Sequence, residues 1–119
     1  MNDEMKKTLL MDFEKNRQML GGILQQKQHY SIQIEVINAS LEELAKTKEK
    51  NVMKIVGNIM IQKSVEEMKK ELTEDLETFD LKLKTVEKQE EKLVSKLNSL
   101  RAEIEEKKPV KEEATKSKK

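Results

Sequence analysis

The side chains in this chain that could act as acids, bases or metal ligands are mainly one histidine, 23 carboxylates and 24 cationic residues, and cysteine is absent. His29 has no second histidine or suitably spaced carboxylate that would make it a metal ligand or a base, so we expect a solvated residue. Carboxylate pairs such as Glu90-Glu91 and Glu105-Glu106 fit the charged faces of helices. No glycine-rich phosphate loop is present. The sequence therefore predicts no catalytic residue, no cofactor and no metal, and a protein that is not an enzyme.

The composition is typical of long solvated helices. Charged residues make up 39% of the 119 residues and aromatic residues 3%, which leaves too few bulky side chains for a thick globular core. The net charge of +1 and the scarcity of stacking aromatics argue against nucleic acid, although the lysine-rich end keeps a nucleic-acid-associated factor as a third hypothesis. A signal peptide and a membrane-spanning run are both missing. We expect a cytoplasmic protein that binds no membrane.

Two ladders of mostly apolar residues, spaced alternately three and four apart, occupy the two halves of the chain. This spacing is the seam of a coiled coil, and it predicts helices over about residues 4–46 and about 65–107. The seams have nearly equal lengths, so we expect the helices to pair antiparallel. The first seam is Leu9, Phe13, Asn16, Leu20, Ile23, Lys27, Tyr30, Ile34, Ile37, Leu41 and Leu44; the second is Val65, Lys69, Leu72, Leu76, Phe79, Leu83, Val86, Glu90, Leu93, Leu97, Leu100 and Ile104.

The ends and the interruptions of these helices can also be predicted. Asn2 or Asp3 can cap the first helix, and Ser64 with Glu67 forms a capping box for the second. The polar seam residues Asn16, Lys27 and Glu90 either fix the register of the coiled coil or lie at the edge of the seam with their polar groups in water. For Lys27 and Glu90 we prefer the second interpretation. Gly21-Gly22 is a hinge or a tolerated pair within a helix that persists, because the seam continues across it.

The segment between the helices predicts one β-hairpin over about residues 52–63. Two β-prone runs flank Gly57-Asn58, which suits a two-residue turn. Both faces of the ribbon are apolar, and a lone two-stranded ribbon is marginal in water, so we expect several hairpins to combine in a shared sheet or barrel. The alternative is a plain turn packed on its helices. The residues predicted to build the oligomer are Val52, Met53, Ile55, Val56, Gly57, Asn58, Ile59, Met60 and Ile61.

The outer ends of the two helices carry apolar residues beyond those that the seam needs. Methionine is flexible and polarizable, which suits contact with many different surfaces. These ends are therefore predicted to bind partner proteins, and the alternative is that their seam members are ordinary core residues. The predicted tip residues are Met1, Met5, Leu9, Leu10, Met11, Phe13, Leu97, Leu100 and Ile104. Residues 1–108 are predicted to be one domain, followed by a disordered lysine-rich tail at 109–119.

Helix, one hairpin and helix, with these particular stretches, resembles the β-type subunit of prefoldin in its archaeal form. The supporting stretches are residues 24–28 (Leu-Gln-Gln-Lys-Gln), 40–44 (Ser-Leu-Glu-Glu-Leu), 54–59 (Lys-Ile-Val-Gly-Asn-Ile) and 85–93 (Thr-Val-Glu-Lys-Gln-Glu-Glu-Lys-Leu). The resemblance implies a hexamer in which two α-type subunits combine with four β-type copies such as this chain. In such a hexamer the hairpins form a double β-barrel and six coiled coils project from it. The Gly21-Gly22 pair and the tail depart from the family pattern.

The resemblance also implies a function. Prefoldin tips hold unfolded client proteins without ATP and deliver them to a group II chaperonin. We therefore expect an all-α dominated chain. Its two helices form an antiparallel coiled coil, and its one β-hairpin joins a shared barrel. The expected function is that of a chaperone (holdase) subunit. The alternative is a coiled-coil scaffold or tether that assembles through the same hairpin but binds no client.

Overall fold

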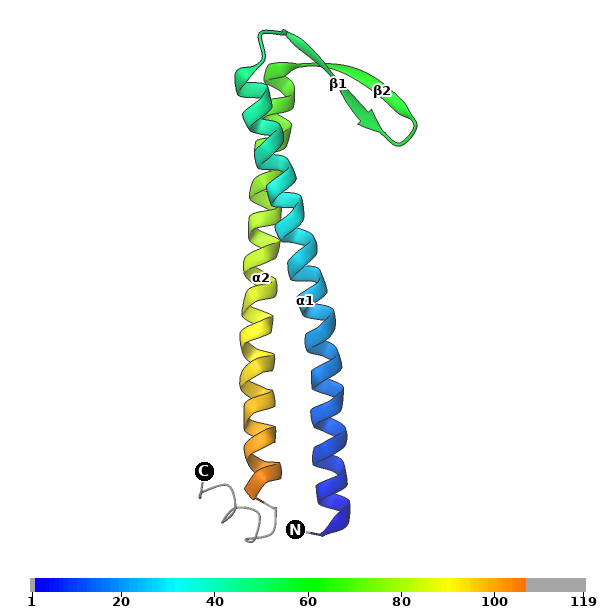
Figure 1. The fold of residues 1–119 in the computed structure, drawn as a ribbon, viewed down its shortest axis with the longest axis vertical. Helices are drawn as coiled ribbons and strands as arrows, with labels where there is room; N and C mark the ends of the chain where they lie inside the picture. Colours follow the sequence, from blue (N-terminus) through cyan, green and yellow to red (C-terminus); the bar gives the residue numbers. More distant parts are fainter. Residues whose placement is uncertain (1, 107–119) are drawn as a thin grey trace, which may run out of the picture. The chain divides into compact units, whose positions relative to one another are not determined.

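A computed structural model describes residues 2–106 of the chain, which form two long helices and one two-stranded sheet (Figure 1). The order is α1 (Asp3–Lys46), β1 (Asn51–Val56), β2 (Ile59–Ser64) and α2 (Val65–Glu106). The predicted pair of helices joined by one antiparallel hairpin is confirmed. Met1, which was predicted to belong to the tip, and the predicted tail at 109–119 lie outside the described residues.

The described chain divides into two compact units, each containing a segment of both helices. We call residues 26–86 the hairpin unit and residues 2–25 with 87–106 the terminal unit. The start of α1 and the end of α2 lie at the same end of the terminal unit (Figure 1). In the described part of the chain, neither helix has a stretch long and apolar enough to cross a membrane.

The heptad seams form the core of each unit. Every predicted seam position in α1 and α2 is buried or half-buried, whereas the charged positions between them are mostly exposed. In the hairpin unit the best-buried seam residues are Ile37, Val65 and Val86, at 5%, 7% and 4% exposure. In the terminal unit they are Leu97 and Leu100. The alternating spacing of three and four keeps these side chains on one stripe of each helix, so the stripe can be covered along its length.

The helix starts are capped by side chains that the sequence singled out. The Met5 N–H donates to Asn2 Oδ1 at 2.8 Å, so Asn2 rather than Asp3 caps α1. The Glu67 N–H donates to Ser64 Oγ at 3.1 Å, which is the Ser64 half of the predicted capping box. β2 passes into α2 with no loop between them, so the first residue of α2 lies at the base of the hairpin. There the Val65 N–H donates to the Lys50 carbonyl at 2.9 Å and closes that base.

The hairpin has the predicted register. Val56 lies opposite Ile59, Ile55 opposite Met60 and Lys54 opposite Ile61. Gly57 has a φ of +59°, and no other described residue has positive φ, so only the first of the two turn positions uses the left-handed region. This is the pattern of a type II′ turn, whose backbone twist matches that of the flanking strands.

Glycine to alanine substitutions will have opposite effects at the turn and in α1. An added Cβ meets nothing within 4 Å at Gly21, Gly22 or Gly57, so backbone preference alone decides the outcome. We expect Gly21→Ala or Gly22→Ala to raise the free energy of unfolding by about 1 kcal/mol. Gly57→Ala should lower it by about 1–2 kcal/mol because of the left-handed φ. Urea unfolding followed by circular dichroism measures both, and a stabilising Gly57→Ala would contradict the turn assignment.

Candidate functional site

The part of the chain that the structure describes contains no group of three or more histidines or carboxylates arranged to hold a metal. His29 is exposed on α1, and its ring lies 5.6 Å from that of Tyr30. Tyr30 in turn lies 6.0 Å from Phe79 of α2, with the Lys82 ammonium over both rings. These rings join the two helices inside the hairpin unit. The features considered next are the surfaces through which the chain can contact other proteins.

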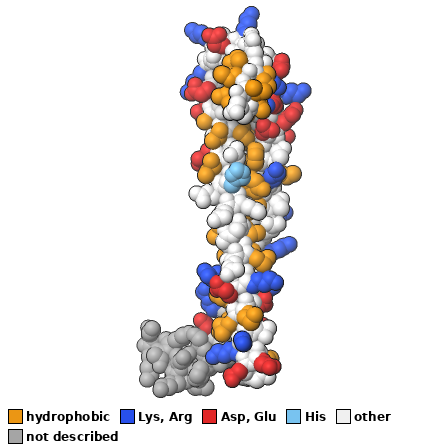
Figure 2. All heavy atoms as spheres, turned by 90° about the vertical axis from the view of Figure 1, so that its right-hand side faces the viewer, with side chains coloured by type: hydrophobic (Ala, Val, Ile, Leu, Met, Phe, Trp, Pro, Cys, Tyr) orange, Lys and Arg blue, Asp and Glu red, His pale blue; other side chains and the backbone are white. Residues whose placement is uncertain are grey.

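The hairpin presents apolar side chains to solvent on both faces. We call the face with Met53, Ile55 and Met60 the outer face; these residues are 51%, 71% and 62% exposed. The opposite face carries Lys54 and Lys63 together with apolar residues, and we call it the lysine face. Its apolar members are Val52, Val56, Ile59 and Ile61. Hydrophobic side chains gather over the hairpin in the space-filling view (Figure 2).

It is uncommon for one two-stranded ribbon to expose so many apolar side chains to solvent. The predicted assembly residues from Met53 to Ile61 are all exposed, and Val52 is half-buried against the helices. In addition, each strand of a two-stranded sheet has one edge whose backbone groups have no neighbouring strand. Exposed apolar faces and open strand edges mark surfaces that bind another chain.

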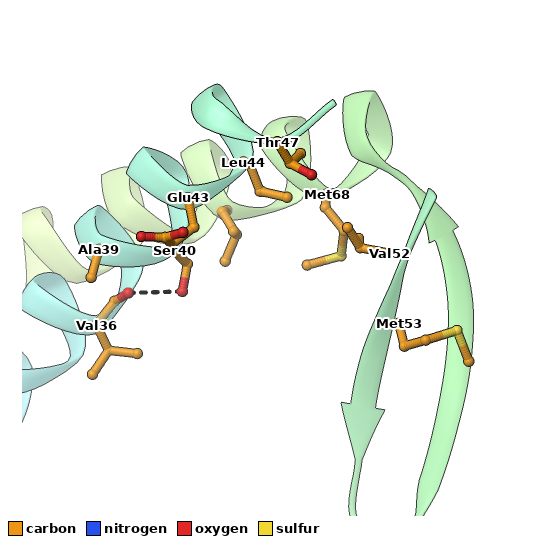
Figure 3. A pocket seen from close by; sticks show the side chains of 10 residues that line it. Val36, Ala39, Ser40, Glu43, Leu44, Thr47, Val52, Met53 and Met68 are labelled. Atoms are coloured by element: carbon orange, nitrogen blue, oxygen red, sulfur yellow. Dashed lines mark hydrogen bonds between the residues drawn. The ribbon is translucent and has the colours of Figure 1, made fainter. Parts of the chain in front are cut away.

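A groove of about 630 Å³ lies between the hairpin and the helices of the same unit (Figure 3). Val36, Ala39 and Leu44 of α1 form one wall, and Val52 and Met53 of β1 form another. Met68 and Leu72 contribute from α2. The Ser40 hydroxyl, which also lines the groove, donates its proton to the Val36 carbonyl at 2.9 Å. The groove is mainly apolar, and the exposed side chain of Val36 is part of its lining.

An ionic cluster connects the hairpin to α2. Lys54 of β1 donates to Oε1 of Glu71, and Lys63 of β2 lies 3.1 Å from Oε2 of the same carboxylate. The hydrogen bonds from Lys54 and then Lys63 hold the pKa of Glu71 below its ordinary value. The two lysines thus favour the ionised form of the carboxylate, and through it both strands are attached to one side chain of the helix.

The structure separates the predicted tip residues into two groups within the terminal unit. Met5, Leu10 and Met11 lie outside the seam and are 56%, 48% and 65% exposed. Leu97 and Leu100 are buried at 8% and 7%. The remaining described members, Leu9, Phe13 and Ile104, are half-buried in the seam. Free contact surface at this end thus comes from the off-seam residues of α1.

Asn16 is the one buried polar residue that the structure describes, at 4% exposure. Its Nδ2 donates to the Asp12 carbonyl at 2.7 Å and lies 3.3 Å from Asp12 Oδ1. The side chain is thus satisfied by its own helix. A local bond of this kind lets a polar group occupy the seam without an unpaired donor.

Several surface features were missed by reading the sequence. Ile32, Val36 and Leu81 are 47%, 55% and 69% exposed although they are large and apolar. Their positions outside the seam were the available signal. The role of Glu71 had no such signal, because its partners are 17 and 8 residues away and meet it only when the hairpin folds toward α2.

Comparisons with known proteins agree with this architecture. The family model described as "Prefoldin subunit" matches residues 7–109. The prefoldin subunit beta of Archaeoglobus fulgidus is 35% identical over 86 residues, covering 71% of this chain and 74% of that protein. The one from Thermococcus onnurineus is 33% identical over 97 residues, covering 81% and 84%. The crystal structure of the prefoldin beta subunit from Thermococcus strain KS-1 superposes with a TM-score of 0.79 at 29% identity, covering 88% of this chain and 95% of that chain.

Proposed function

The chain belongs to the prefoldin subunit family, whose members are chaperone subunits, and on that premise we propose that it is a β-type subunit of an ATP-independent holdase. The observation that carries the proposal is the hairpin with two exposed apolar faces. Such a ribbon has no sheet to join among the described residues, so it needs hairpins from other chains.

Assembly through the hairpin is the first part of the proposal. Copies of this chain and α-type subunits would contribute their hairpins to a shared β-barrel, in which the outer face and the lysine face both become covered. Two α-type and four β-type chains are the composition that the family suggests. Burying side chains as exposed as Ile55 and Met60 favours association, because each contributes roughly 1.5–3 kcal/mol when fully covered.

Client binding at the outer ends of the helices is the second part. Met5, Leu10 and Met11 offer exposed, flexible apolar side chains to the apolar segments of non-native proteins. Leu9, Phe13, Leu97, Leu100 and Ile104 would add to this surface when the ends of the helices fray. Each contact is weak, and several subunits of one complex acting on the same client supply avidity.

Transfer of the held client to a group II chaperonin in the cytoplasm completes the proposal. No step of this cycle requires a cofactor, nucleic acid or a membrane. A coiled-coil scaffold would share the assembly surface, but it would not use the exposed residues at the ends of the helices.

The deciding experiment is suppression of aggregation. The chain, co-purified with its partner subunits from its native host, is mixed with a chemically denatured model protein in the absence of nucleotide, and light scattering is followed. We expect suppression at near-stoichiometric amounts of complex. An intact multimeric complex that leaves aggregation unchanged would favour the scaffold.

A further inference from the structure

Glu71 is the only described residue whose side chain is seen to bond both strands of the hairpin to a helix. Its carboxylate receives Lys54 from β1 on one oxygen and Lys63 from β2 on the other. The three side chains are partly shielded, with 33%, 29% and 30% exposure for Lys54, Lys63 and Glu71. A carboxylate with one cation on each oxygen fixes direction better than a single pair does, because rotation about one contact breaks the other.

Both lysines project from the same face of the ribbon. Lys63 lies opposite Val52, and Lys54 follows Val52 by two residues, so these side chains share one side. Attaching them to α2 turns the lysine face toward the helix. Near the turn, Ile55 and Met60 of the outer face are then directed away from α2 and are 71% and 62% exposed, against 46% and 59% for Val56 and Ile59 of the lysine face.

Among the described residues, the other features that hold the ribbon in this orientation lie near its base. The bond from Val65 to the Lys50 carbonyl joins its base to the helix start. Val52 is half-buried, but Val56, Ile59 and Met60 near the turn remain exposed. Without Glu71 the two lysines would be unneutralised neighbours on the same face, and the ribbon would lose its ionic attachment to α2.

We propose that Glu71 is a positioning residue for assembly: by binding Lys54 and Lys63 together it sets the face of the hairpin that is presented to the hairpin of a neighbouring prefoldin-type subunit. This assignment rests on the proposed assembly through the hairpin. Partly exposed ion pairs contribute little to stability, so the effect falls on orientation more than on folding. Apparent affinity scales with the fraction of molecules in the competent orientation.

The test compares Glu71→Gln with Glu74→Gln, an exposed carboxylate three residues further along α2. The absence of cysteine allows spin labels to be placed at Asn58→Cys in the turn and Asp80→Cys on α2. In the isolated chain, Glu71→Gln should broaden the distance distribution from pulsed electron resonance, and Glu74→Gln should not. Unchanged circular dichroism for both variants shows that the helices are retained.

Assembly is measured with the α-type partner by sedimentation velocity at about 50 and 500 mM salt. Glu71→Gln should weaken the affinity of assembly about three- to tenfold at low salt. At high salt, where the ion pairs are screened, the affinity of the unsubstituted chain should fall toward that of Glu71→Gln. The charge swap Glu71→Lys with Lys54→Glu and Lys63→Glu should restore both the narrow distances and the assembly.

The two measurements separate the possible failures. Equal distance distributions in all variants would overturn the positioning role, whatever the state of assembly. A chain that shows the distance effect but never assembles with its partner would contradict the proposed function instead, and with it the role of Glu71 in assembly. Glu71→Gln could also lose helix content. In that case the charge-swap variant decides: if it regains its helices but its spin-label distances stay broad, the positioning role of Glu71 is overturned.

Discussion

We expect Ile55→Asp to remove the chain from the complex proposed above. Ile55 is 71% exposed in the isolated chain and lies on the outer face opposite Met60, where assembly would cover it. A carboxylate buried there without a partner costs about 3 kcal/mol or more. Since about 1.4 kcal/mol corresponds to a tenfold change, we expect association to weaken at least a hundredfold. Native mass spectrometry of the chain mixed with its α-type partner measures this loss.

Leu81→Asp is the matched control for this substitution. Leu81 is 69% exposed, nearly the same as Ile55, but it lies on α2 and away from the hairpin strands. The same charge there should leave the complex intact. Equal behaviour of the two variants, whether both assemble or both dissociate, would show that the hairpin is not the assembly surface.

Serine at positions 5, 10 and 11 will separate client holding from assembly. The triple variant Met5→Ser, Leu10→Ser and Met11→Ser removes the exposed apolar side chains at the start of α1 and leaves the seam residues in place. Each lost side chain removes part of a contact, and the loss is repeated in every β-type subunit, so avidity falls steeply. We expect at least about a tenfold increase in the amount of complex that half-suppresses aggregation, with an unchanged oligomer.

The control for the tip variant makes the same chemical change elsewhere. Ile32→Ser, Leu81→Ser and Val94→Ser also remove three exposed apolar side chains from the two helices, at 47%, 69% and 39% exposure. This triple variant should hold clients as well as the unsubstituted chain does. If it loses as much holding activity as the tip variant, clients bind along the helices and the tip assignment is wrong.

The sequence was sufficient to predict the elements because each has a local cause. The seam spacing placed residues such as Ile37 and Val86 in the core. Ser64 marked the start of α2, and Gly57 marked the turn through its tolerance of positive φ. The hairpin register followed from a two-residue turn, since that turn leaves a single pairing of the flanking strands.

The remaining features depend on contacts that no local pattern encodes. In the sequence, Glu71 is one of many charged residues on a predicted helix. Its ion pairs with Lys54 and Lys63 form only when the hairpin folds toward α2. Asn16 interrupts the seam in the sequence, yet it is buried because Asp12 of the same helix satisfies it. Seam membership already indicated that Leu97 would be a core residue and that Met5 would lie outside the core, and the structure agrees. Their role in binding clients remains a prediction.

The hydrogen bond from Val65 to Lys50 has a consequence for the order in which the chain folds. It closes a short loop that contains only the hairpin, and short loops close with the least entropy loss and form fastest. Antiparallel seam partners grow more distant in sequence from there toward the termini, so pairing should spread outward from Leu44 and Val65. The terminal unit would form last and open first, and amide hydrogen exchange should be slower around Leu72 than around Leu97. A chain that opens in this order can loosen its outer ends without disturbing its hairpin.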